Sequence, residues 1–246
     1  MRALYLKELS SFLSSTIGYV FILIFLIASG LFHWILSFNN NEYNLLEGSE
    51  ADMVPFFNLS PIIFLILIPA ITMKSFAEEK RTGTIELLFT RPISDFGILM
   101  AKYLAGVTLL VIAIAPTITY YISMYFLGKP IGIIDGGATL TSYIGLILLG
   151  SVFVAIGIFA STITSSQIIA FIVSMFLCWF LFDGLNQLGD FGQLGDLDFY
   201  VKYLSLTHHY DSITMGVIVS ENIIYFLSVI LLFLSLAITV IKTLKR

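Results

Sequence analysis

The sequence has very little charge. Only 11% of its 246 residues are Asp, Glu, Lys or Arg, whereas soluble domains carry about 25%. Hydrophobic residues make up 58% of the chain and the mean hydropathy is +0.98. A chain with so few charges cannot cover a globule with polar surface. The composition therefore excludes a water-soluble domain and indicates a polytopic membrane protein.

Cysteine and phosphate-binding motifs are also scarce. The single cysteine, Cys178, lies in an apolar run, which excludes a disulfide framework and predicts a packing role. No segment matches the phosphate loop G-x-x-x-x-G-K-[ST], and the Gly-rich stretch 128–137 lacks its Lys-Ser/Thr end. Adjacent His208 and His209 would point in different directions on a helix, so one metal ion rarely binds both. We therefore expect no enzymatic activity, cofactor or metal ion on this chain.

Apolar runs that can cross a bilayer recur six times. A span needs about 20 apolar residues to cross about 30 Å of hydrocarbon. Residues 136–182 carry no charge and would form a helix about 70 Å long, so the chain must turn back within them. The polar run 161–167 predicts that turn. The expected fold class is an all-α polytopic membrane protein with one transmembrane domain over residues 1–246. The predicted spans are residues 17–37, 56–75, 97–127, 139–160, 167–185 and 221–241.

Basic residues predict the orientation. An even number of spans places both termini on one side. If that side is the cytoplasm, it holds ten of the 12 Lys and Arg residues, and only Lys129 and Lys202 lie outside. Cytoplasmic loops are enriched in Lys and Arg, so we expect both termini in the cytoplasm. No ionisable residue is predicted in the middle of a span, which argues against an ion-driven carrier and a membrane-embedded enzyme.

Residues 1–16 predict an amphipathic helix that lies in the inner membrane interface before the first span. Leucines recur at helical spacing, while charged residues occupy other positions. The alternative is an extension of the first span. The residues assigned to the interfacial helix are Leu6, Lys7, Glu8, Leu9 and Phe12.

Residues 76–94, FAEEKRTGTIELLFTRPIS, place clustered charge between two apolar spans. Gly83 predicts the end of one helix. Thr84 can cap a second helix, and Pro92 limits this helix to one or two turns over Ile85–Thr90. A helix this short is unstable alone in water, so it must pack against the membrane, another segment or a partner. One reading is an ordinary loop in the headgroup region. The other is a docking element with an apolar face and a charged rim.

Three segments resemble ABC-2 type exporter permeases. EEKRTGTIELLFTRPIS follows the coupling pattern E-x-x-x-G-T-[LI]-E-L-L-x-[ST]-x-P-[IV]-[ST] of that family. LKELSSFLSSTIGYVFILIFLIASG resembles its N-terminal interface helix and first span, and HHYDSITMGVIVSENIIYFLS resembles the stretch before its last span. Within the family, the overall sequence is most similar to the gliding-motility-associated permease subunit, the F component.

The resemblance implies that separate subunits carry out ATP hydrolysis and transport. A separate cytoplasmic ABC ATPase subunit would bind ATP and Mg²⁺, and its closure would push on the short helix between the second and third spans. A second permease copy or a related membrane subunit would complete the pathway in the bacterial inner membrane. Short re-entrant helices would precede the last span, and no nucleic acid would take part. The residues expected to couple to the ATPase are Glu78, Glu79, Arg81, Gly83, Thr84, Ile85, Glu86, Leu87, Leu88, Phe89 and Pro92.

A second function remains compatible with the sequence. The complex could use ATP to drive assembly or secretion of a larger machine, with this chain as a membrane anchor that moves no solute. The same coupling segment would serve both functions, so a substrate assay is needed to separate them.

Overall fold

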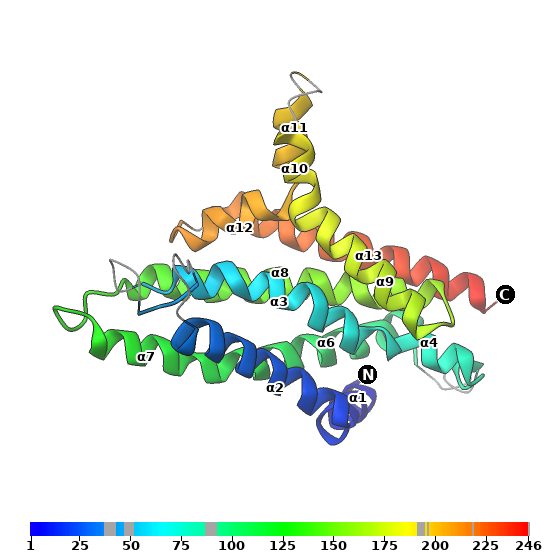
Figure 1. The fold of residues 1–246 in the computed structure, drawn as a ribbon. Coiled ribbons are helices and arrows are strands. Elements are labelled where there is room, and N and C mark those ends of the chain that lie inside the picture. Colours follow the sequence, from blue (N-terminus) through cyan, green and yellow to red (C-terminus); the bar gives the residue numbers. More distant parts are fainter. Residues whose placement is uncertain are drawn as a thin grey trace.

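The computed structural model describes residues 1–36, 43–46, 52–86, 93–190, 195, 197–217 and 219–245. Within these residues every regular element is a helix, and six helical stretches are long and apolar enough to cross a membrane. They lie side by side as an elongated bundle (Figure 1). The predicted all-α, six-span fold class is confirmed. The six stretches are Thr16–Ile35, Val54–Arg81, Asp95–Leu127, Gly136–Ile163, Gln167–Asp190 and Ser220–Leu244.

Most of these stretches are built from several helical segments. The first to third stretches comprise α2 (Thr16–Gly30) with the π-helix η1 (Leu31–Ile35), α3 (Val54–Thr72) with α4 (Lys74–Arg81), and α6 (Asp95–Ile114) with the 3₁₀ turn η2 (Ala115–Thr117) and α7 (Ile118–Leu127). The others comprise α8 (Gly136–Ile163), α9 (Gln167–Trp179) with the π-helix η3 (Phe180–Gly184) and α10 (Leu185–Asp190), and α13 (Ser220–Leu244). Three shorter helices are α1 (Arg2–Ser14), α11 (Leu197–Tyr203) and α12 (Leu206–Thr214).

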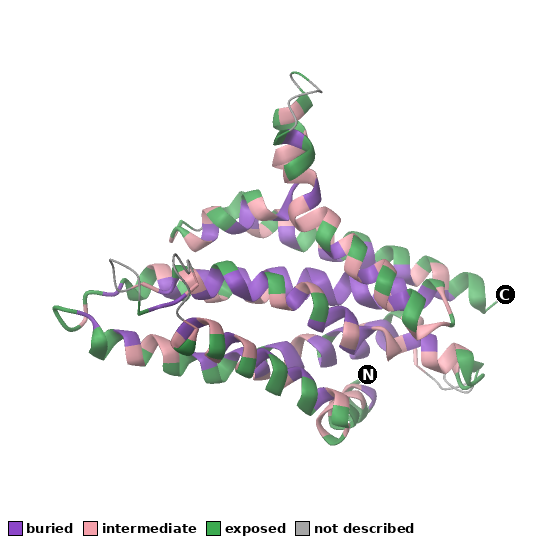
Figure 2. Cartoon of the chain, viewed as in Figure 1, coloured by how far each residue is buried: buried purple, intermediate pink, exposed green. Residues whose placement is uncertain are grey.

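Helix α8 forms the centre of the bundle. In its most apolar stretch 78% of the residues are buried, compared with 22% to 61% in the other five spans (Figure 2). Small residues permit this close packing. A Cβ atom on Gly150 would lie 2.4 Å from the Leu110 side chain, and one on Gly157 would lie 1.9 Å from the Thr72 hydroxyl. The hydrophobic core therefore forms where α3 and α6 approach the α8 backbone.

The chain leaves the bundle after η3. Helices α10 and α11 project sideways from the bundle, and α12 returns along α8 and α13 (Figure 1). The hydroxyls of Ser205 and Thr207 both donate to the carbonyl of Phe182, and the first of these bonds is 2.6 Å long. The ring of Phe182 lies 6.1 Å from that of Phe153 in α8. The short helices expected before the last span are therefore present, and the α10–α11 hairpin is anchored at its base.

Lys102 and Asp183 lie further from a span end than the sequence-based interpretation expected. Lys102 lies in α6, which begins at Asp95, so it is nearly two turns inside the third span. Asp183 lies in η3, because the fifth span continues as a helix to Asp190. Its carboxylate accepts a hydrogen bond of 2.5 Å from the amide of Gln187. The helices extend to Asp95 and Asp190, beyond the predicted bounds at 97 and 185, so each of the two residues lies seven positions from a span end.

A labelling experiment tests the predicted orientation of the bundle. Cys178 is fully buried, so a cysteine at the exposed position of Thr84 should be the reactive thiol of a Thr84→Cys variant. In sealed bacterial cells we expect a membrane-impermeant maleimide to leave Thr84→Cys unlabelled and to label Lys129→Cys, because the two positions are predicted on opposite sides. Labelling of Thr84→Cys from outside would overturn the topology.

Candidate functional site

One end of the bundle gathers charged side chains from several helices. This charged end comprises α1, α4, the first turns of α6, and the last turns of α8 and α13 (Figure 1). The Lys245 ammonium, next to α13, lies 3.2 Å from the carboxylate of Asp95, the first residue of α6. Both chain ends and the segment between the second and third spans therefore meet here.

Lys102 is the central cation of the charged end. Its side chain is only 3% exposed, and its Nζ lies 2.8 Å from Oε1 of Glu79 and 3.4 Å from Oε1 of Glu8. The same ammonium lies 5.0 Å from the centre of the Phe76 ring. A buried ammonium is very unfavourable unless anions or π-systems compensate it. Lys102 in α6 therefore holds α1 through Glu8 and α4 through Glu79 and Phe76.

Helix α4 is also attached to the central helix. The Lys80 ammonium donates a hydrogen bond to the carbonyl of Thr162, in the last turn of α8. The last four carbonyls of a helix have no partner within it, and a cation at this end also interacts favourably with the helix dipole. Helix α4 follows α3 directly at Met73. It is therefore an extension of the second span that is connected to three other helices.

The N-terminal helix packs on α6. Leu4 is buried and the Tyr5 hydroxyl lies 2.9 Å from the hydroxyl of Thr108. Leu6 is 51% exposed, so Leu4 and not Leu6 fills the protein-facing side. Among the other residues assigned to the interfacial helix, Glu8, Leu9 and Phe12 are partly buried and Lys7 is exposed. An exposed leucine beside an exposed lysine fits an interfacial helix, and the location of α1 at a membrane surface stays a prediction.

A pocket of about 430 Å³ lies between α1, α4 and α6. Three lysines and three glutamates line it, so its charges are mixed. One carboxylate oxygen, Oε2 of Glu79, is buried and has no hydrogen-bond partner among the described residues. Mixed charge and an unpaired acceptor fit a charged or polar group from a partner better than an apolar ligand. The charged residues of the lining are Lys7, Glu8, Lys74, Glu78, Glu79 and Lys102.

The chain turns sharply after α4. Gly83 has φ +72°, which favours glycine, and its amide donates to the carbonyl of Lys80 at 3.3 Å. The predicted helix end at Gly83 is therefore confirmed. The hydroxyl of Thr84 lies 2.9 Å from that of Thr82 and donates to the Glu79 carbonyl at 3.5 Å. It thus contacts the end of α4, which the sequence did not predict.

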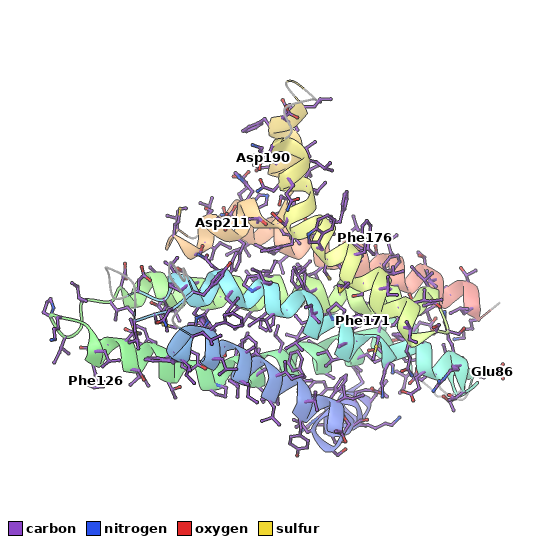
Figure 3. The ribbon with its side chains drawn as sticks, viewed as in Figure 1. Glu86, Phe126, Phe171, Phe176, Asp190 and Asp211 are labelled. Carbon is purple, nitrogen blue, oxygen red and sulfur yellow. The ribbon has the colours of Figure 1, made fainter. Side chains whose placement is uncertain are left out.

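Only the beginning of the predicted short helix is described. Ile85 and Glu86 are helical; Ile85 packs against the hydrophobic core, and Glu86 is exposed at the tip of the charged end (Figure 3). Leu87, Leu88, Phe89 and Pro92 lie outside the described residues. Ser94 caps the next helix, α6, because its side chain accepts a hydrogen bond of 3.1 Å from the Gly97 amide.

The structure brings together only part of the predicted coupling set. Glu78, Glu79 and Thr84 line the pocket, together with Glu8 from the predicted interfacial helix. Arg81 and Gly83 are exposed on the outside of the turn. The sequence-based set omitted Lys102 and Lys80, which make the ionic and capping contacts. A single lysine at the start of an apolar run was the available signal for Lys102.

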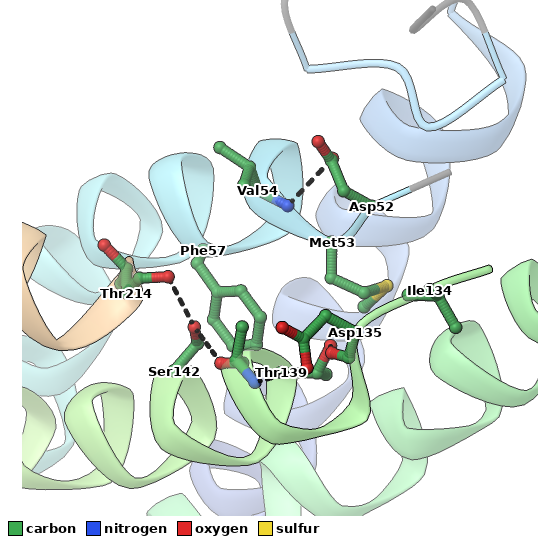
Figure 4. A pocket seen from close by; sticks show the side chains of 10 residues that line it. Asp52, Met53, Val54, Phe57, Ile134, Asp135, Thr139, Ser142 and Thr214 are labelled. Atoms are coloured by element: carbon green, nitrogen blue, oxygen red, sulfur yellow. Dashed lines mark hydrogen bonds between the residues drawn. The ribbon is translucent and has the colours of Figure 1, made fainter. Parts of the chain in front are cut away.

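Carboxylates at the opposite end of the bundle have local roles. Asp52 and Asp135 border a cavity of about 60 Å³ (Figure 4). Asp52 accepts from the Val54 amide at 3.2 Å, and Asp135 accepts from the amides of Gly137 and Ala138 at 2.8 and 3.1 Å. Both therefore satisfy helix N-termini. In the part of the chain that the structure describes, no group of three or more His, Cys, Asp or Glu residues could hold a metal ion.

The chain matches the model of a known protein family. The family model for the ABC-2 family transporter protein matches residues 2–244, which include all six spans and the charged end. No curated protein matches the chain.

A double-mutant cycle tests the ionic junction. Glu8→Gln or Glu79→Gln should each leave Lys102 with one carboxylate, whereas the double variant leaves a buried ammonium without an anion. We expect the double variant to lose about 1–3 kcal/mol more unfolding free energy than the sum of the single losses. The measurement is unfolding of the purified protein in detergent.

The exposed ion pair of Lys202 and Asp190 provides the matched control. Its side chains are 40% and 62% exposed, so Asp190→Asn should cost at most about 1 kcal/mol. Strictly additive losses for Glu8→Gln and Glu79→Gln would show that Lys102 does not join the two helices energetically.

Proposed function

Since the chain belongs to the ABC-2 family of transporter proteins, it is the membrane permease subunit of an ABC transporter, and we propose that it couples ATP hydrolysis by a separate cytoplasmic subunit to export. The observation that carries this proposal is the junction at Lys102. One buried ammonium joins α1, α4 and α6, at the end of the bundle that the basic residues assign to the cytoplasm.

The surface around this junction suits a protein partner. Arg81 and Glu86 are exposed at the tip, and the mixed-charge pocket lies between α1 and α4. Opposite charges in such a rim fix the register of an interface. The sequence adds two apolar residues, Leu88 and Phe89, for the partner's groove, whereas Ile85 packs against the core of this chain. That partner would bind ATP and Mg²⁺. This chain would bind neither, and its helices would be displaced by the partner's movement.

The contacts of α4 provide a route for that movement. A displacement of α4 acts on α3 through the continuous chain, on α8 through Lys80 and Thr162, and on α6 and α1 through Lys102. Packed helices respond to such a push as rigid elements that rotate or slide. A movement at the charged end would therefore reach four helices at once.

The position of the α10–α11 hairpin supports pairing with a second permease copy or a related subunit. Its base contacts Phe153, which follows Gly136, the first residue of α8, by 17 positions. At 1.5 Å per residue this is about 25 Å along a helix of about 42 Å. Asp183 lies at this level, and Asp190 and Lys202 lie further along the hairpin. Charged groups at such depth avoid lipid, so we propose that protein or a water-filled pathway covers them.

The biological setting is the narrower part of the proposal. We propose the inner membrane of a bacterium, with both termini in the cytoplasm and a role in gliding motility. The motility role is supported by the resemblance of the overall sequence to the F component. A membrane anchor that transports no solute would use the same junction, and transport of a labelled substrate in proteoliposomes separates the two functions.

Charge reversal at the tip tests ATPase docking. We expect Glu86→Arg to abolish co-purification of the ATPase subunit with the chain in mild detergent, because the charged rim would then repel its partner. Membrane insertion and the yield of the chain should stay at the wild-type level.

Glu221→Arg is the matched control. Glu221 is exposed in the first turn of α13, at the other end of that helix, so this variant should retain the ATPase. Wild-type association of Glu86→Arg would remove this residue from the docking surface. A purified complex without any ATPase would overturn the proposed function itself.

A further inference from the structure

Two apolar stripes face each other away from the charged end. One stripe runs from Val111 to Tyr121 along α6, η2 and α7, and the other runs from Gly136 to Ile147 along α8. In both stripes the lining residues recur at spacings of three or four, so each forms one face of a helix. Together they line a groove of about 420 Å³, within the range of pockets that bind small molecules.

A kink in the third span keeps the two stripes apart. Pro116 lies in the 3₁₀ turn η2, where it interrupts the helix. The Tyr143 hydroxyl of α8 donates to the Thr117 carbonyl at 3.0 Å and lies 3.2 Å from its hydroxyl. Near this contact the groove is open to the surroundings, since Ile118 and Leu140 remain 50% and 64% exposed.

The membrane around the groove indicates which kind of ligand the groove binds. Both walls belong to membrane-spanning stretches, so the surrounding solvent is hydrocarbon. Gly136 and Ile147 are 11 positions apart in α8, or about 16 Å along the helix. This is close to half of the roughly 30 Å hydrocarbon core, which is the depth of one leaflet. We infer that the groove binds one acyl chain of a membrane phospholipid from the leaflet at this end of the bundle.

The mouth of the groove does not offer a phosphate site. The N-terminus of α8 would attract an anion, but the carboxylate of Asp135 already accepts from the amides of Gly137 and Ala138. A Cβ atom on Gly136 would lie 2.8 Å from the Tyr121 hydroxyl, so this tyrosine lies at the mouth, in the manner of interfacial aromatic residues. The groove therefore recognises the chain and not the headgroup.

A chain in this groove differs from bulk lipid because it has protein on two sides. Dispersion contacts are individually small, but they add over every methylene that touches both walls. An empty groove would leave both stripes without those contacts. The bound chain would thus fill the space between the third and fourth spans beyond the kink, and it would remain with the protein when bulk lipid is removed.

Lipid retention by the purified, intact complex tests the inference. Ala115→Phe and Leu140→Trp each place a larger side chain in the groove. Ile172→Trp in α9 is the matched control, because Ile172 is 54% exposed in the fifth span and does not line the groove. By native mass spectrometry after mild delipidation, we expect the wild type and the control to retain about one phospholipid per chain and both groove variants to lose it.

Reconstitution with phosphatidylglycerol or phosphatidylethanolamine of identical chains should give equal retention, because Asp135 occupies the anion site. A strong preference for one headgroup would overturn the acyl-chain assignment, as would retention by the groove variants or no retention by the wild type. Disulfide cross-linking of Leu140→Cys between two chains would show that a second copy fills the groove instead.

Folding is checked by size exclusion. If the groove variants do not fold, a phosphatidylcholine spin-labelled on its acyl chain should show an immobilised component with the wild type that unlabelled phospholipid displaces. Its absence would equally refute the site. Neither result depends on ATPase docking, so this inference and the proposed function can fail separately.

Discussion

The buried ammonium of Lys102 is the interaction on which the arrangement of the charged end depends. An almost fully buried cation in an apolar helix needs anions within reach, and the chain supplies them from Glu8 and Glu79, on helices outside the core of the bundle. Neither α1 nor α4 can leave α6 without removing part of this compensation. Because Lys102 needs both carboxylates, it fixes α1 and α4 against α6. Any partner that moves α1 or α4 therefore acts on the third span.

The helices pack more closely in the half of the bundle near the charged end than in the other half. Around the middle of α8, glycines at positions 150 and 157 bring neighbouring spans so close that a Cβ would collide. Further from the charged end, η2 and η3 interrupt the third and fifth spans, and the packing opens into a groove and a sideways hairpin. Close packing transmits displacement, whereas the open half can rearrange. This gradient fits a molecule that receives a push at one end and changes shape at the other.

The sequence predicted those features that depend on local patterns. Hydropathy and length indicated six spans, and the helix end at Gly83 followed from the conformational freedom of glycine. The junction was not predictable, because Lys102 meets partners 94 and 23 positions away and no periodicity links them. The choice of Leu4 over Leu6 for the buried side of α1, and the sideways course of α10, likewise depend on tertiary contacts. Leu87, Leu88, Phe89 and Pro92, at the centre of the expected coupling segment, stay a prediction.

The packing of α1 on the third span also sets an order for biosynthesis. Glu8 emerges from the ribosome first, yet its partner Lys102 follows 94 residues later, and Thr108 follows Tyr5 by 103. At about 5–20 residues per second, translation needs roughly 5–20 s to close that interval. The nascent N-terminal helix must spend this time without its intramolecular partner, and the first helix to be synthesised docks only after the beginning of the third span has left the ribosome.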